Sequence, residues 1–515
     1  MILEILLCLL AALLLIITHV LYKKMNYFYD RNIPQLKPIF FFGHSYETVT
    51  GKKNNIDVME REYRILKNED IIGHLEAFQP NYMIRNPEYV QKILIKDFAY
   101  FHDRLVSDGE IKTPFDANLF LLGGNLWRAI RNKFSPLFTT GKLKYMYHSM
   151  ADCGKNLISY LDKKDGMDVE ITDVMGLFAM DVIGSTTFGI EPTLLNDPSS
   201  KFREMGKRLF DFNAFMMLKT LFLIFLPKVA KFLGLKGFFD IEATEFFYGV
   251  IRDSLEYRKR EGFERNDFVQ MLLQLKEKGR IELQIHDPAD DYLKMDDKEQ
   301  DVYEVEMSDN ILIGGAFSFL FAGFHASAMT LSYTLFELSQ HPEVVKKLRE
   351  EIKERTGGGE PTYEDIKSMT YLEQVVKETL RLHPSAGVTG RVCTKEYTFP
   401  NGVTVVPGEN LIIPVAALQK DPAYWTEPEV FNPDRWNSDF TPRPGTYLPF
   451  GDGPRVCIAM RFAMMEIKFA VALLIQNYDF KVNEEKTQLP LKLKPRAILA
   501  TPDGGITFTI NKISG

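Results

Sequence analysis

One segment near the end of the chain constrains the structure more than any other: Phe450–Cys457, with the sequence FGDGPRVC. Its two glycines and its proline force a tight loop, and a long apolar helix is expected to begin at Ile458. Cys457 then stands at a helix N-terminus beside Arg455, where the helix dipole and the positive charge favour the thiolate, which is a metal ligand. A lone cysteine in a glycine-rich turn is often only structural, but the spacing Phe-x-x-Gly-x-Arg-x-Cys argues against that interpretation.

Charge and cysteine content exclude several classes of protein. The 515 residues carry 62 Lys and Arg against 69 Asp and Glu, a net charge of −7. This mild negative charge argues against a general nucleic-acid-binding protein. The four cysteines are too few and too scattered for a disulfide framework, so a reducing compartment is the simpler interpretation.

The N-terminal segment differs from that of a typical soluble protein. Ile5–Ile17 is unbroken apolar sequence, and Val20–Tyr22 extends it to about the minimum length that crosses a bilayer as a helix. Lys23 and Lys24 follow it and Glu4 precedes it, which predicts that the body of the protein stays on the cytosolic side. A cleaved signal peptide needs a basic segment before the apolar run and a small-residue cleavage site after it, and both are missing.

The sequence therefore predicts three parts. Residues 1–24 form a membrane anchor, residues 25–45 form a stiff linker that contains two prolines, and residues 46–515 form one catalytic domain. Within that domain, no repeat or low-complexity segment marks a further boundary.

Four stretches of the body carry structural predictions. Residues 202–240 are so apolar that they are either core or a surface that dips into a membrane, and the sequence does not decide between the two. Residues 287–306 are acidic and predict a solvated loop. Residues 307–340 predict a long helix that is apolar nearly all round, with Ser308 or Asp309 as N-cap, and residues 390–415 predict a small hairpin sheet.

Four motifs occur together in this order. Trp127–Arg131 reads WRAIR, Glu378–Arg381 reads ETLR, Phe431–Trp436 reads FNPDRW, and the cysteine loop follows them. In this combination the sequence resembles the cytochrome P450 superfamily over essentially its whole length, and most of all the animal microsomal members and insect detoxification enzymes. The resemblance implies a mainly helical α+β fold with small β-sheets, a long central helix over a haem, and a single N-terminal transmembrane helix.

The resemblance also implies a set of site residues. Cys457 would be the thiolate ligand of haem b, in a loop that begins at Phe450. The haem propionates would be bound by Trp127, Arg131, Arg391 and Arg455, with Arg104 as a weaker candidate. A structural cluster beneath the haem would comprise Glu378, Arg381 and Arg435.

The chain departs from the family pattern at two positions. The long helix usually carries an acid followed by threonine, a pair that helps to deliver protons during dioxygen activation. Here the segment reads Ala322-Gly323-Phe324-His325-Ala326-Ser327, so His325 replaces the acid and Ala326 the alcohol. Ser327 is about 100° further round the helix and is expected to point elsewhere. The second departure is Ala459, where a glycine is usual; we expect one extra methyl group to be tolerated.

The first departure leaves alternatives open. In one, the enzyme is still a monooxygenase, and either His325 titrates near neutrality and carries protons or a substrate hydroxyl replaces the missing alcohol. In another, the enzyme rearranges or dehydrates peroxides or oximes, as a haem-thiolate dehydratase or isomerase. His325 could equally fill a polar notch, which is compatible with either chemistry. A non-catalytic haem carrier or sensor is a further alternative.

The resemblance implies partners and a location. Electrons would come from NADPH through cytochrome P450 reductase, with cytochrome b5 as a second donor, at the endoplasmic reticulum membrane with the catalytic domain in the cytosol. A candidate basic landing site for the reductase comprises Arg128, Arg131 and Lys133, extended by Lys346, Lys347 and Arg349, although a charge run on a helix is more often only a solvated face. The pocket for a small lipophilic substrate is expected to be lined by Phe317, Phe321, Ala322, Ala326, Ser385, Ala386, Gly387 and Val388.

Overall fold

The computed structural model describes most of the chain. Its described residues are 2–104, 111–190, 194–210, 215–216, 219–220, 229, 232–235, 239–262, 264–265, 267–284 and 302–513. Most of the expected acidic loop at 287–306, and part of the apolar segment at 202–240, lie outside the described residues. Residues 302–306 of the expected loop form a strand.

Helices make up most of the body, as the sequence predicts. They are α1 (Ile2–Met25), α2 (Tyr46–Val49), α3 (Asn55–Ile65), α4 (Pro87–Gln91), α5 (Gly124–Phe134), α6 (Thr140–Asp162), α7 (Ile171–Ile183), α8 (Lys201–Phe210), α11 (Ile241–Glu261), α12 (Phe268–Lys278), α13 (Asp309–Gln340), α14 (Pro342–Thr356), α15 (Tyr363–Ser368), α16 (Thr370–Leu382), α17 (Val415–Leu418) and α18 (Met460–Asn477). Short helical turns are η1 (Lys92–Lys96), η2 (Phe98–Tyr100), η3 (Ser135–Phe138), η4 (Gly184–Phe188), η6 (Pro433–Trp436) and η7 (Gly453–Arg455).

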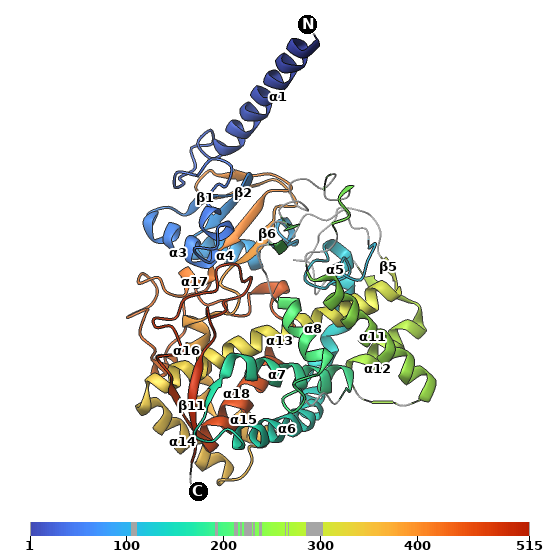
Figure 1. Ribbon diagram of the computed structural model, residues 1–515, viewed down its shortest axis with the longest axis vertical. Coiled ribbons are helices and arrows are strands. Elements are labelled where there is room, and N and C mark those ends of the chain that lie inside the picture. The colour runs from blue at the N-terminus through green and yellow to red at the C-terminus, as the bar shows by residue number, and fades with distance from the viewer. Residues whose placement is uncertain are drawn as a thin grey trace.

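The predicted central helix is α13. Ser308 is its N-cap, with its side chain accepting a hydrogen bond from the Ile311 N–H, and the helix is buried along most of its length. It crosses the middle of the body with α7 and α18 beside it (Figure 1). Gly323 permits the close approach of α7, because a Cβ atom there would lie 2.6 Å from Cδ1 of Ile183.

Within the described residues, four small sheets complete the fold. Their strands are β1 (Ile71–Glu76), β2 (Gln79–Ile84), β3 (Asp168–Glu170), β4 (Arg280–Gln284), β5 (Val302–Glu306), β6 (Thr389–Val392), β7 (Tyr397–Thr398), β8 (Thr404–Val405), β9 (Asn410–Ile413), β10 (Tyr478–Val482) and β11 (Thr507–Lys512). The orders are β1-β2-β9-β6, β10-β11-β3, β4-β5 and β7-β8. The predicted sheet at 390–415 is therefore present, but β6 and β9 extend it through a parallel pairing of β9 with β2.

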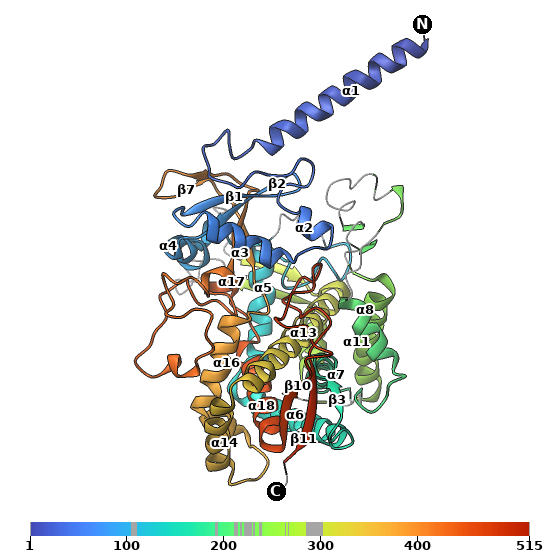
Figure 2. The ribbon, with the colours of Figure 1, turned by 60° about the vertical axis from the view of Figure 1, so that its left-hand side comes forward.

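The two ends of the chain lie at opposite ends of the molecule. Helix α1 projects away from the body next to the β1-β2 sheet, whereas the C-terminus lies near α14 and α6 (Figures 1 and 2). Among the residues described, two segments are long and apolar enough to cross a membrane, Ile171–Phe188 and α13, and their most apolar windows are 89% and 72% buried. Burial of this extent identifies both as core helices.

Candidate haem-binding site

A cavity of about 1240 Å³ lies between α13 and the cysteine loop. Its walls are rich in aromatic side chains, and several arginines contribute to them. The aromatic residues include Phe115, Phe120, Phe239, Phe319, Phe321 and Phe450. A concave apolar site with a few convergent charged groups is the usual form of a ligand-binding site.

Glycines shape the loop that carries Cys457. Gly453 has φ +66°, and a Cβ atom at this position would collide with the carbonyl oxygen of Leu94. The Cys457 N–H donates to the Phe450 carbonyl oxygen at 2.9 Å, which closes the loop. The helix after the loop, α18, begins at Met460, two residues later than predicted.

The side chain of Cys457 faces the cavity. Burial raises the pKa of its thiol, while the Ala459 N–H and the charges of Arg104 and Arg131 lower it, and the net shift is upward. The arginines that favour the thiolate are therefore not the Arg455 expected from the sequence. Because a metal ion deprotonates a coordinating thiol outright, this environment fits a sulfur ligand whose charge is stabilised by bound iron.

Arg455 is held by groups from the first quarter of the chain. Its Nε donates to the His102 carbonyl oxygen at 2.9 Å and its Nη2 to that of Leu122 at 2.8 Å. The guanidinium carbon lies 3.8 Å from the centroid of the Trp127 ring, a cation–π geometry. Asp103 Oδ1 lies 3.5 Å from Nη2. Arg455 is therefore fixed in a buried position at the cavity.

Near Cys457, two further arginines line the cavity and a third is buried beside them. Arg104 Nη2 donates to the Arg455 carbonyl oxygen at 3.0 Å, and Arg131 Nη2 donates to that of Val456 at 2.7 Å. Arg391 is 2% exposed, and its Nη1 donates to the Gly390 carbonyl oxygen at 2.7 Å. Arg391 itself is not among the cavity-lining residues, so its contact with a propionate remains a prediction.

These arginines lack sufficient counter-charge from the protein. Burial, and then the charge of Arg131, lower the pKa of Arg104 to about 10. The pKa values of Arg391 and Arg455 are lowered by burial and by the neighbouring guanidinium groups. Three buried nitrogens of the described cluster, Arg104 Nε, Arg391 Nε and Arg455 Nη1, have no hydrogen-bond partner. Such a group fits a ligand with two carboxylates, as haem has, because buried N–H groups without partners are costly.

The sequence did not indicate that the two residues before Arg104, His102 and Asp103, belong to the site. Asp103 Oδ1 accepts hydrogen bonds from the Gly124 N–H and from His102 Nδ1, both at 2.8 Å. Burial raises the pKa of Asp103, but the His102 and Gly124 hydrogen bonds outweigh it and keep the net shift downward. The only sequence signal was the charged run FHDR, which is equally typical of a surface.

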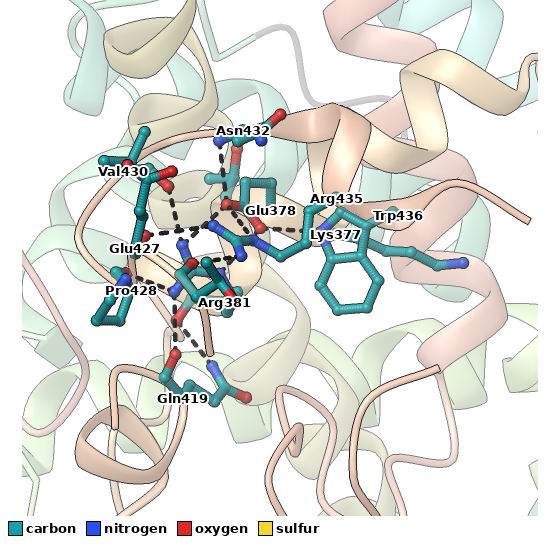
Figure 3. A network of polar contacts seen from close by, with 12 residues as sticks. Lys377, Glu378, Arg381, Gln419, Glu427, Pro428, Val430, Asn432, Arg435 and Trp436 are labelled. Carbon is teal, nitrogen blue, oxygen red and sulfur yellow. Dashed lines mark hydrogen bonds and ion pairs between the residues drawn. The ribbon is translucent and has the colours of Figure 1, made fainter. Parts of the chain in front are cut away.

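The expected structural cluster is assembled around Glu378 (Figure 3). Arg381 makes a bidentate pair with this carboxylate at 2.9 and 2.8 Å, and both side chains are fully buried. Arg435 Nε lies 3.3 Å from Oε1, the Asn432 N–H donates to the same oxygen at 3.1 Å, and Trp436 Nε1 donates to Oε2 at 2.9 Å. This buried carboxylate is therefore saturated with donors.

Arg381 also fixes the segment between α17 and the cysteine loop. Its guanidinium donates to the carbonyl oxygens of Gln419, Pro428 and Val430 at 3.0, 2.6 and 3.1 Å (Figure 3). The Gln419 side chain in turn accepts the Leu448 N–H at 2.8 Å, two residues before Phe450. The cluster therefore anchors the chain that leads into the thiolate loop.

His325 does not titrate near neutrality. Burial, and then the positive charge of Lys494, lower its pKa to about 4. Its Nε2 lies 2.9 Å from Thr501 Oγ1, whose own proton goes to the Leu499 carbonyl oxygen, so His325 Nε2 is the donor. This lowered pKa argues against a proton carrier that changes charge at neutral pH, because the imidazole is buried beside a cation.

Ser327 lies at the cavity wall and is bonded toward α18. Its hydroxyl donates to Glu466 Oε2 of α18 at 2.7 Å. Burial raises the pKa of Glu466 to about 8 and the Ser327 hydrogen bond only partly opposes this, so the carboxyl group is largely protonated at neutral pH. The sequence did not single out Glu466, because it is one acid in an apolar helix.

The family model for cytochrome P450 matches residues 33–509. The chain belongs to the cytochrome P450 family. It is therefore a monooxygenase-type oxidoreductase with a haem-thiolate cofactor.

Insect P450s are similar over nearly their whole length. Cytochrome P450 6k1 of Blattella germanica is 33% identical over 495 residues, which cover 95% of this chain and 93% of the relative. Cytochrome P450 9e2 of the same organism is 34% identical over 504 residues, covering 93% and 92%. Cytochrome P450 6a2 of Drosophila melanogaster is 32% identical over 524 residues, covering 99% and 100%.

Most of the residues expected in the pocket of this P450 line the cavity. They are Phe321, Ala322, Ala326, Ser385, Ala386 and Val388, and Gly323 and His325 of the same helix motif line it as well. Phe317 does not: it is fully buried, with its ring 5.1 Å from that of Tyr248 and 6.1 Å from that of Phe321. Gly387 is also absent from the lining, because it packs against Ile56. Both residues lie on faces that turn into the core.

Ala459, the second departure of this P450 from its family, is the N-cap residue of α18 and lines the cavity. Its φ of −96° is open to any residue, so the backbone there does not require glycine. Tolerance of its methyl group beside the haem remains a prediction.

The expected landing site of this P450 needs correction. Arg128 is 2% exposed and Arg131 faces the cavity, so neither is available as a surface cation. Of the α5 residues proposed for this role, Lys133 alone is left as a half-buried candidate.

The second basic group lies on α14. Lys346 is exposed, whereas Lys347 is paired with Asp434, and Arg349 donates to two backbone carbonyl groups and to Asp479. Intramolecular partners therefore occupy two of its three cations.

Proposed function

We propose that this P450 oxidises a small lipophilic molecule with dioxygen, using electrons that pass from NADPH through cytochrome P450 reductase, with cytochrome b5 as a second donor. The observation that carries the proposal is one cavity of about 1240 Å³ that combines Cys457, the arginine cluster and a largely apolar wall. An apolar wall favours an apolar substrate, because transfer out of water contributes about 25 cal/mol per Å² of buried apolar surface.

The residues of the site have distinct roles in this proposal. Cys457 binds the haem iron through its sulfur, and Arg104, Arg131, Arg391, Arg455 and Trp127 hold the propionates. The bound haem supplies the chemistry of oxygen activation. Glu378, Arg381 and Arg435 keep the thiolate loop in place and do not contact the substrate.

The proton supply must differ from the usual acid–alcohol pair. Ala326 has no hydroxyl group, and His325 is neutral and bound to Thr501. We propose that Glu466 stores the proton and that Ser327, which lines the cavity and donates to Glu466 Oε2, connects it to the site. A carboxyl group with a pKa of about 8 can release a proton at neutral pH and regain it.

One observation favours a second candidate, a haem-thiolate dehydratase or isomerase of peroxides or oximes. Such a reaction needs no external proton relay, which agrees with alanine at position 326. Oxygen consumption with NADPH and the reductase, measured against product formation, separates the two. Substrate-dependent oxygen uptake supports the monooxygenase, whereas turnover without oxygen uptake supports the rearrangement. Absence of any turnover would leave the carrier or sensor alternative.

Two variants test the site itself. We expect Cys457→Ala to abolish the thiolate-type absorption of the reduced CO complex. An unchanged spectrum would contradict the assignment of the sulfur ligand. We expect Ala326→Thr, which restores the missing hydroxyl group, to raise the fraction of consumed oxygen that appears in product. Unchanged coupling would show that position 326 does not limit proton delivery.

For location, we propose the endoplasmic reticulum membrane, with residues 1–24 as anchor and the catalytic domain on the cytosolic face. Support comes from the exposed leucines of α1 and from further exposed apolar side chains that include Phe40, Phe41, Phe215 and Phe232. The last two belong to the apolar segment 202–240 and favour its contact with the membrane. Extraction of the full chain from microsomes by alkaline carbonate tests the anchor, since a peripheral protein would be released.

A further inference from the structure

Three oxygen atoms form a hydrogen-bonded triangle on the wall of the cavity. Thr330 Oγ1 lies 2.9 Å from the Ala326 carbonyl oxygen, Ser385 Oγ lies 3.1 Å from the same oxygen, and the two hydroxyls are 3.0 Å apart. All three residues line the cavity. Thr330 and Ser385 are 2% and 8% exposed, so bulk water is not their usual partner.

The triangle contains more contacts than protons. The two hydroxyl groups have one proton each, whereas the oxygens make three close contacts, so one contact is always redundant. When Thr330 donates to the Ala326 carbonyl, that acceptor is satisfied without Ser385. The Ser385 proton can then turn into the cavity while no buried backbone group loses its partner.

Neighbouring polar groups do not have this freedom. The His325 Nε2 proton is directed to Thr501, and the Ser327 proton is directed to Glu466. Redirecting the His325 proton would leave Thr501 Oγ1 without its donor, and the Ser327 hydroxyl is already engaged with Glu466 in the proposed proton supply. Ser385 is therefore the better placed of these donors to bind a guest in the cavity.

The position of Ser385 is fixed even though its proton can turn. The Ala500 N–H donates to the Ser385 carbonyl oxygen at 2.9 Å, and the Ala416 N–H donates to that of Gly387, also at 2.9 Å. The loop after α16 is thus tied to the C-terminal segment on one side and to α17 on the other. A donor on a rigid loop can select a ligand by geometry.

We propose that Ser385 determines specificity by donating its hydroxyl proton to an acceptor oxygen of the substrate, while Thr330 keeps the Ala326 carbonyl satisfied. The substrate class is then a largely apolar molecule that carries a ketone, ester or ether oxygen. This inference rests on the proposed function, since it names the substrate class of the same site.

The test compares two probes of equal chain length, 2-dodecanone and dodecane, on the ferric holoenzyme. Each probe competes with 4-phenylimidazole, whose binding to the iron is read from the Soret band. The measured quantity is the ratio of the two dissociation constants, because the difference in hydration between the probes cancels between variants. We expect Ser385→Ala to reduce the preference for the ketone roughly two- to ten-fold and to leave dodecane affinity unchanged.

Three further variants sharpen the test. Ser385→Thr keeps the hydroxyl and should keep the preference. Thr330→Val leaves the Ala326 carbonyl to Ser385 and should reduce the preference although Ser385 is present. Ser339→Ala is the matched control, because its hydroxyl donates to the Phe336 carbonyl at 2.6 Å in the same helix, outside the cavity lining, and it should change nothing.

Several results would overturn the proposal: equal ratios in the wild type and Ser385→Ala, an equal loss of affinity for both probes, or failure of both probes to compete. The reduced CO spectrum verifies each variant, and Thr330→Val carries the test where Ser385→Ala yields no haem protein. Binding is measured without reductase or oxygen. The binding result therefore does not depend on turnover, and a failure of the proposed monooxygenase reaction can be told apart from a failure of this proposal.

Discussion

The Ser327 hydroxyl donates a 2.7 Å hydrogen bond to Oε2 of Glu466 and so joins α13 to α18 in the core. Glu466 is fully buried, and its other oxygen has no hydrogen-bond partner. The pair places a carboxyl group in the interior that is most stable when it is protonated.

The first prediction concerns this carboxyl group. Its pKa is raised from 4.5 to about 8 on folding, so between these values the folded state binds more protons than the unfolded state. Stability is therefore greatest below pH 4.5 as far as this group is concerned, and is lost as pH rises through 8. In the wild type this group should lower the free energy of unfolding by an amount on the order of 2 kcal/mol between pH 6 and 9. We expect Glu466→Gln to abolish that decrease, as measured by the pH dependence of the thermal midpoint.

Asp181 provides the control for that measurement. Burial raises its pKa to about 7 despite hydrogen bonds from the Leu194 and Leu195 N–H groups, so it adds a loss of the same sign at lower pH. Glu466→Gln should therefore reduce the fall of the thermal midpoint on the alkaline side. The fall that remains near pH 6 in this variant is then due to Asp181. An unchanged alkaline slope would contradict the buried, protonated state of Glu466.

The second prediction concerns the arginine cluster. Arg391→Gln removes a buried guanidinium from the group that is expected to hold the propionates. We expect the affinity for haem to fall roughly ten-fold, because hydrogen bonds to charged groups contribute about 1.5–3 kcal/mol. The haem-to-protein ratio after extensive dialysis measures this loss. Arg443→Gln, at an exposed pair with Glu88, is the matched control and should retain haem fully. Equal haem retention by both variants would rule out a role of Arg391 in haem binding.

The third prediction concerns the Glu378 cluster. Glu378→Ala leaves Arg381 and Arg435 without their shared carboxylate in a buried site, and breaking such a pair costs about 3–5 kcal/mol. We expect a large loss of folded, haem-containing protein, measured by the CO spectrum and by thermal unfolding. Glu429→Ala breaks an exposed ion pair with Arg64 and should cost less than about 1 kcal/mol. Similar midpoints for the two variants would contradict the anchoring role.

The fourth prediction concerns His325. Its pKa is lowered from 6.5 to about 4 on folding, so between these values the unfolded state binds more protons and stability falls as pH falls. We expect His325→Asn to reduce acid destabilisation between pH 6.5 and 4 by an amount on the order of 2 kcal/mol, measured by urea denaturation. The same variant should leave the pH profile of turnover between pH 6.5 and 8 unchanged in shape. A titration near neutrality that disappears in the variant would show instead that His325 carries charge there.

The sequence predicted those parts of the site that depend on local order. The turn before Cys457, the pair Glu378–Arg381 three residues apart on one helix, and the capped helix at Asp309–Gln340 are all specified by neighbouring residues. Strands β1 and β2 were missed, because each is short and becomes a strand through pairing with the other and with the distant β9.

Errors arose where a residue's environment comes from distant segments. Arg104 lies at the site because it donates to the carbonyl oxygen of Arg455, 351 residues later in the chain. Arg128 is buried, although a helical charge run usually faces solvent. Phe317 was assigned to the pocket by its helix alone, but Tyr248 of α11 covers it. The lowered pKa of His325 likewise required the position of Lys494, which the sequence did not provide.

Gly453 lies against the carbonyl oxygen of Leu94, and Arg455 is bound by carbonyl groups at 102 and 122. The groups that shape and hold the sulfur-bearing loop therefore come from residues 94–122, whereas the loop itself is synthesised more than 300 residues later. Capture of the porphyrin is accordingly a late event in biogenesis, and a nascent chain that ends before Cys457 has an arginine cluster with no sulfur opposite it.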